Sequence, residues 1–239
     1  LNKLTEGAVH LGLDAGAGKV SEVFTHAQNV QRNWFKGAHP AGNVGVHIHH
    51  VDPINTGETV WFISPQDVIA IGRTMLDGKF YGDRVIAVTG AELETTGYYR
   101  TKIGAHIEPF IKDNLVQDHV RVIAGDVLTG AATDAKQYLG LYDDQVTVVK
   151  EGDYHELFGW LIPLKPRPSI SRTFPNFLFP TMEFEADTNM HGESRAFVVT
   201  GQYESVLPMD IYPQHLLKAI LAKDFERMEG LGILELAEE

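Results

Sequence analysis

Cysteine is absent from this 239-residue sequence. Without it the chain cannot build a disulfide framework, a thiolate metal site, an iron–sulfur cluster or a cysteine nucleophile. The absence fits a protein of a reducing compartment. Long apolar runs are also missing, because the strongest one, LFGWLIPL at 157–164, contains a proline and falls far short of the roughly 20 residues of a membrane helix. We therefore expect no transmembrane segment in this chain.

Positive charge is scarce as well. The formal net charge is −12, and the lysines and arginines are scattered along the chain, which argues against a nucleic-acid partner. Hydrophobic residues make up 44% of the sequence, which is enough to fill a core without stabilising disulfide bonds. The chain opens with LNKLTEG, without an initiator methionine or a signal peptide, which predicts a piece of a longer protein.

Several common catalytic and nucleotide-binding motifs are missing. The turn GAHPAG is followed by Asn43, and Gly18-Lys19 is followed by Val20, so neither has the lysine and hydroxyl residue of a P-loop. No GxGxxG spacing follows a strand, no GxSxG elbow is present, and no HExxH helix occurs. A glycine-rich turn can still present backbone amides to an anion or a carbonyl oxygen.

Apolar periodicity predicts a mixture of α/β and α+β structure in four segments: an α/β portion at 1–83, a β-grasp-like unit at 84–150, a proline-rich connector with a strand at 151–204, and a helical segment at 205–239. The expected strands are 9–13, 44–51, 60–63, 84–90, 98–103, 120–124, 145–150 and 195–201. The expected helices are 65–77, about 107–115, 213–223, and a short one from Phe225 onward.

Four of the eleven histidines fall within the stretch 37–50. On a strand, His47 and His49 would share one face, and with His39 they would offer three imidazole ligands to zinc. The alternative is that they are half-buried strand residues bonded to neighbouring backbone or carboxylates. No carboxylate stands at a ligand spacing, so we expect no metal site.

Aromatic residues flank the same stretch. With His39, they would form a flat apolar slot with one polar tip, which suits a ring with carbonyls at its edge. The alternative is that they are core residues. The aromatic residues concerned are Trp34, Phe35, Trp61 and Phe62.

Carboxylates give weaker signals. Gln66-Asp67 opens a predicted helix, where an acidic residue favours the positive end of the helix dipole, and this interpretation is preferred to a catalytic role. A second acidic group near the C-terminus is interpreted as a solvated face, and it comprises Glu226, Glu229, Glu235, Glu238 and Glu239.

A family resemblance is carried by several longer runs. They are GAHPAGNVGVHIHHVDP, VWFISPQDVIAIG, RVIAGDVLTG, YLGLYDDQVTVVKEG, LFGW, VLPMDIYPQHLLKAIL and LGILELAEE. Together, and in this order, they resemble the A subunit of the sodium-translocating NADH:quinone reductase. The family's chain begins well before Leu1 and continues past Glu239 into a cysteine-containing tail, which weakens the inference about a reducing compartment.

The resemblance implies a peripheral subunit on the cytoplasmic face of the bacterial inner membrane, within a respiratory translocase that passes electrons from NADH to ubiquinone or menaquinone and exports Na⁺. Flavins and iron centres are expected on partner subunits, including one in the membrane, and no tightly bound cofactor is expected here. Related flavin-binding subunits imply a Rossmann-like layer before the β-grasp-like unit. They carry a different glycine motif in place of the HPAG turn, so flavin and NADH binding are not carried over.

Three hypotheses follow. In the first, the protein contributes to quinone binding and reduction, with His39 donating a hydrogen bond or a proton; the candidate residues are Trp34, Phe35, Gly37, His39, Pro40, Gly42, His47 and His49. In the second, it is a structural adaptor that docks on membrane partners through Phe174, Phe177, Leu178 and Phe179. The third and weakest is a histidine metalloenzyme. Catalytic residues stay unassigned, and we expect the chain to be inactive alone.

Overall fold

The structure is a computed structural model that describes residues 1–156, 183–194 and 196–237. It contains both helices and strands, with two sheets, which confirms the expected mixture of α and β structure. Contacts divide the chain into two compact units: Leu1–Ser64 with Phe197–Glu239, and Pro65–Ala196. This grouping does not follow the limits of the four predicted segments, since residues 65–83 fall in the second unit; those limits stay predictions.

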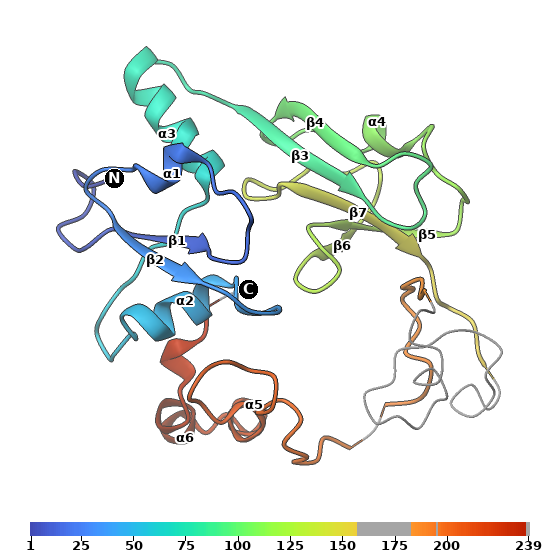
Figure 1. The fold of residues 1–239 in the computed structure, drawn as a ribbon. Coiled ribbons are helices and arrows are strands. Elements are labelled where there is room, and N and C mark those ends of the chain that lie inside the picture. Colours follow the sequence, from blue (N-terminus) through green and yellow to red (C-terminus); the bar gives the residue numbers. More distant parts are fainter. Residues whose placement is uncertain (157–182, 195, 238–239) are drawn as a thin grey trace. The chain divides into compact units, whose positions relative to one another are not determined.

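The first unit holds a two-stranded parallel sheet and several helices (Figure 1). Strands β1 and β2 pair in the register Leu13 to Trp34, and of the residues in these two strands only Leu13 is buried. The elements of this unit are β1 (His10–Asp14), α1 (Glu22–Thr25), β2 (Gln31–Phe35), α2 (Val44–Val51), α5 (Pro213–Ala222), α6 (Phe225–Gly230) and the 3₁₀ turn η2 (Ile233–Glu235).

Helices α5 and α6 follow the predicted periodicity. Helix α5 begins at Pro213, where proline is pre-organised for a helix, and buries Leu216 on its inner side. It ends at Lys223, which adopts a left-handed conformation, and Asp224 then caps α6 by accepting a hydrogen bond from the Arg227 amide at 3.2 Å. The two predicted C-terminal helices are therefore confirmed.

The second unit is built on a five-stranded sheet with the order β4-β3-β7-β5-β6. Strands β3 and β7 are parallel, and the other neighbouring pairs are antiparallel. Strand β6 was not expected from the sequence, because three residues of Ala131–Thr133 are too short to show a period. The elements of this unit are α3 (Pro65–Asp77), β3 (Asp83–Thr89), β4 (Gly97–Lys102), α4 (Glu108–Ile111), β5 (Val120–Ala124), β6 (Ala131–Thr133) and β7 (Gln145–Lys150).

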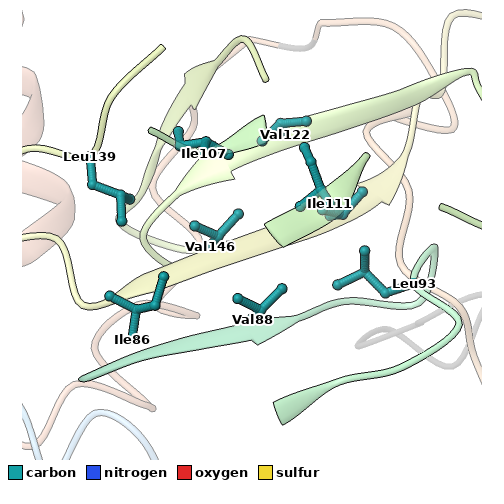
Figure 2. Close-up of a cluster of buried hydrophobic side chains, with 9 residues drawn as sticks. Ile86, Val88, Leu93, Ile107, Ile111, Val122, Leu139 and Val146 are labelled. Carbon is teal, nitrogen blue, oxygen red and sulfur yellow. The ribbon is translucent and has the colours of Figure 1, made fainter. Parts of the chain in front are cut away.

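One face of this sheet carries the core of the second unit (Figure 2). Alternate residues of β3, Ile86 and Val88, project to the same side as Val146 of β7, and Ile107 and Ile111 cover them. All five are at most 1% exposed. Burial of each such aliphatic side chain contributes about 1.5–3 kcal/mol to folding, so this cluster stabilises the unit.

Helix α3 is fastened to β3 through its first turn. The Gln66 side-chain amide donates to the Val85 carbonyl and accepts from the Val85 amide, both at 2.9 Å. Next to it, Asp67 accepts a hydrogen bond from the guanidinium of Arg84, which is 4% exposed. Gln66 and Asp67 therefore anchor the helix, in addition to any interaction of Asp67 with the helix dipole.

The prediction of a strand at 44–51 is wrong, because this segment forms helix α2. Apolar residues alternate in VGVHIHHV, but short apolar runs do not distinguish a strand from a helix. The helix buries Gly45 and Val46, and its histidines bond to three different parts of the first unit. These tertiary contacts override the local pattern.

Two further predicted strands are absent from the described residues. Residues 60–63 are irregular and exposed, and residues 196–201 form no ladder. β-Branched and aromatic side chains favour a strand only weakly by themselves, because the preference depends on packing against neighbouring strands. The helix predicted near 107–115 is regular only at 108–111.

The proline-rich connector at 163–180, with its four predicted anchors, lies outside the described residues. None of the helices in the described part of the chain is long and apolar enough to span a bilayer.

Candidate functional site

The histidine-rich stretch forms a turn between β2 and α2. After Phe35 the chain folds back through two backbone hydrogen bonds of 2.9 Å, from the Ala41 amide to the Ala38 carbonyl and from the Asn43 amide to the Pro40 carbonyl. The His39–Pro40 peptide bond is cis. A side chain at Gly37 would place its Cβ only 2.9 Å from the Cβ of Ala41, so glycine suits this close approach.

His47 holds this turn against the sheet. Its ring stacks on Phe35, with 3.8 Å between ring centroids and 11° between the planes. Its Nε2 donates to the Ala41 carbonyl at 3.0 Å. Nδ1 faces Gly12 of β1. His47 therefore acts as a packed support for the turn.

His49 and His50 connect α2 to the C-terminal part of the first unit. The Asp210 amide donates to Nε2 of His49 at 3.1 Å, so Nδ1 carries the proton and donates to Glu235. His50 donates through Nε2 to the Pro208 carbonyl at 2.8 Å. The assignment of Glu235 to a solvated face is wrong, since its carboxylate binds His49; sequence spacing carried no signal for a pair 186 residues apart.

His39 differs from the other three histidines of the stretch. It is exposed at the tip of the turn, and within the described residues neither of its ring nitrogens has a hydrogen-bond partner. Trp34 is half exposed on β2. Phe35 contacts His47, but in the described part of the chain no ring contact joins Trp34, Trp61 or Phe62 to one another. The structure thus brings together Phe35, His47 and the turn 37–42.

The turn lies at the carboxyl-terminal edge of the parallel pair β1–β2. The loop after β1 reaches the same edge, because the Ala15 amide donates to the Phe35 carbonyl at 2.7 Å, and a Cβ at Gly16 would lie 3.7 Å from Lys36 Cγ. Ligands of α/β proteins bind at this end of parallel strands.

Within the described ranges, no three His, Asp or Glu side chains are grouped so that they could hold a metal ion.

Gly12 provides a test of this arrangement. A Cβ at this position would lie 2.6 and 2.8 Å from ring atoms of His47, so Gly12→Ala must push the imidazole off Phe35. We expect the free energy of unfolding to fall by about 1–3 kcal/mol, as in overpacked cores, measured by urea unfolding with tryptophan fluorescence. Gly18→Ala is the matched control, since a Cβ there meets nothing within 4 Å. Equal midpoints for the two variants would contradict the packing role of His47.

Among the described residues, the titratable groups whose pKa values are clearly shifted all belong to the second unit. Hydrogen bonds from Arg121 and then Thr188 hold the pKa of Glu151 below its ordinary value. Burial alone would raise the pKa of Asp187, but hydrogen bonds from Tyr154 and the Asn189 amide, together with His191, outweigh it and lower that pKa. Sequence reasoning missed this cluster because its members come from three segments that are distant in the sequence: Arg121 of β5, residues 151–154 and residues 187–191.

Comparison with known proteins gives two family-model matches. The model described as the NqrA second alpha/beta domain matches residues 1–80, and the model described as the NQRA C-terminal domain matches residues 85–135. Together they span more than half of the chain.

Matches that run along the whole of this chain agree with these models. The chain is 40% identical over 240 residues to the A subunit of the Na(+)-translocating NADH-quinone reductase of Yersinia pestis bv. Antiqua, and 42% identical over 240 residues to that of Photorhabdus laumondii. It is 43% identical over 242 residues to that of Rhodopirellula baltica. Each match covers 100% of this chain, and the chain spans about half the length of these relatives. On these matches, the chain belongs to the NqrA family of the Na⁺-translocating NADH-quinone reductases.

Proposed function

We propose that this chain is part of a peripheral subunit of a respiratory Na⁺-translocating NADH:quinone oxidoreductase, where it contributes to quinone binding and to quinone reduction coupled to Na⁺ export. The relatives named above are NqrA subunits of such a reductase. The observation that carries the quinone-binding part is the state of His39, whose ring has no partner within the described residues while His47, His49 and His50 are hydrogen-bonded.

The chemistry of a quinone suits this turn. A quinone presents two carbonyl oxygens on a flat apolar ring, and the exposed imidazole of His39 can donate a hydrogen bond to one of them. Histidine also exchanges protons near neutral pH, as quinone reduction requires. The half-exposed indole of Trp34, one residue before Phe35, offers an aromatic face on the same strand. Gly37, Pro40 and Gly42 shape the turn around His39.

The remaining parts of the proposal concern partners and architecture. Flavins and iron centres belong to partner subunits, quinone is a substrate, and this chain holds no tightly bound cofactor. The chain lies on the cytoplasmic face of the bacterial inner membrane, where its partners include a membrane subunit, and Na⁺ translocation belongs to them. We propose a Rossmann-like portion at 1–83 and a β-grasp-like unit at 84–150, followed by the connector at 151–204 and the helical segment at 205–239.

His39→Ala tests the quinone site. Loss of one hydrogen bond to a carbonyl is expected to weaken binding of a quinone analogue about tenfold, measured by titration with tryptophan fluorescence. His215→Ala is the matched control, because His215 is also exposed in the first unit and has no hydrogen-bond partner within the described residues. Unchanged affinity in His39→Ala would refute the role of His39. If neither the parent chain nor the His215→Ala control binds the quinone analogue, the result would favour the alternative function, a structural adaptor that docks on membrane partners without binding quinone.

A further inference from the structure

A second polar site lies in the second unit, where the chain leaves β7 and later returns. Residues 150–156, which lead out of β7, and residues 187–191 form a set of hydrogen bonds that we call the clasp (Figure 1, yellow and orange). Lys150 and Asp187 form an isolated parallel bridge. The clasp therefore joins residues that are more than 30 positions apart in the chain, and it rests on contacts within one unit.

The inner part of the clasp, where Glu151 and Gly152 meet Thr188, contains no histidine side chain. The Thr188 amide donates to the Lys150 carbonyl at 3.2 Å, and the Gly152 amide donates to the Thr188 hydroxyl at 2.8 Å. That hydroxyl donates in turn to Glu151. Arg121 of β5 binds Glu151 with two hydrogen bonds of 2.7 and 2.8 Å, a bidentate pair that keeps this carboxylate ionised.

The outer part of the clasp is centred on His191. Its Nε2 lies 3.2 Å from Asp187 Oδ1 and its Nδ1 lies 3.4 Å from Glu156 Oε2. Tyr154 donates to the other Asp187 oxygen at 2.6 Å. Both carboxylates are mostly buried, with side-chain exposures of 10% for Asp187 and 16% for Glu156. The titratable groups that face the ring within the described residues are thus Asp187 from its own segment and Glu156 and Tyr154 from the segment after β7.

Only one protonation state satisfies both contacts of the ring. A neutral imidazole carries one N–H, so its other nitrogen would point a lone pair at a carboxylate. Nδ1 of His191 is buried and lies at an ion-pair distance from Glu156 without a hydrogen bond. An imidazolium has an N–H on each nitrogen and one positive charge between two negative ones, which removes the conflict.

We propose that His191 makes the clasp a pH-dependent latch: the imidazolium bridges Asp187 and Glu156, and its deprotonation loosens residues 187–191 from the end of β7. The direction of the pH dependence follows from the charges. The contribution of His191 is present when the ring is protonated and is lost as the pH rises. Asp187 has a pKa held below its ordinary value and stays ionised across the neutral range.

Amide hydrogen exchange of the whole chain tests the latch. After correction for intrinsic exchange rates, we expect the amides of Thr188, Asn189 and His191 to be roughly tenfold better protected at pH 5.5 than at pH 8. In His191→Asn this difference should disappear. Asparagine is chosen because the residue has a φ of 50°, a left-handed conformation that asparagine tolerates. Amides of β3 and β7 should keep their protection at both pH values.

Matched variants make the outcome decisive. His119→Asn removes another histidine paired with a carboxylate of the same region, Asp153, but outside the outer clasp, so the pH difference should persist in it. Glu156→Gln removes one of the two negative charges and should reduce the difference while leaving the fold intact. Equal protection at both pH values in the parent chain, or a pH difference that survives in His191→Asn, would overturn the proposal. If His191→Asn fails to fold, the parent chain and Glu156→Gln decide it.

Discussion

Gly90→Ala is expected to lower the free energy of unfolding of the second unit by more than about 4 kcal/mol. Gly90 directly follows β3 and has a φ of +127°, a conformation that residues with a side chain rarely adopt. A Cβ there would lie 1.9 Å from the carbonyl oxygen of Val148 and 2.6 Å from its nitrogen. Val148 is fully buried in β7, in the middle of the sheet, so neither backbone can move without breaking the ladder.

Gly104→Ala is the matched control for this effect. Gly104 also has a positive φ, of 71°, but a Cβ there meets nothing within 4 Å. Its replacement should cost only the conformational penalty, about 1–2 kcal/mol. Unfolding in urea, followed by circular dichroism, measures both variants. Similar losses for the two would show that backbone conformation alone, and not contact with Val148, sets the requirement for glycine at position 90.

Gly90 illustrates what the sequence reveals about the fold. The run RVIAVTG predicts a buried strand that ends at the glycine, and β3 confirms it. The helices at 65–77 and 213–223 were predictable for a similar reason, since their apolar positions repeat with a helical period over ten or more residues. Local periodicity does not show that β7 passes within contact distance of Gly90, because this depends on pairing between distant segments.

The candidate site was predictable only in part. The glycine-histidine turn is visible as a local cluster, and the structure places Phe35 and His47 beside it. The helix at 44–51 was not predictable from alternation, because contacts of His49 with Asp210 and Glu235 decide its conformation. The clasp shows the same limit, since Tyr154 and Asp187 come together only through the return of the chain to β7.

Asp67→Ala is expected to destabilise the second unit by about 3 kcal/mol, because it breaks a buried ion pair and leaves a charge behind. Arg84 is 4% exposed, and its guanidinium donates to Asp67 at 2.7 Å and to the Leu141 carbonyl at 2.9 Å. Without Asp67 the guanidinium keeps the carbonyl as an acceptor but loses its counter-charge. The same substitution removes one of the contacts that hold the first turn of α3 on β3, while both hydrogen bonds of Gln66 with Val85 remain, so we expect a modest rise in the exchange of α3 amides.

A double-mutant cycle separates these effects. Arg84→Met removes the buried charge, so Asp67→Ala should cost much less in the Arg84→Met background than in the parent chain, and urea unfolding measures the difference. Asp83→Ala is the matched control: Asp83 pairs with Lys102, whose side chain is 74% exposed, and loss of such a surface pair should cost less than about 1 kcal/mol. Equal costs for Asp67→Ala with and without Arg84 would show that the pair is not coupled. The requirement for Asp67 would then come from the N-terminus of α3, where an acidic side chain favours the positive end of the helix dipole.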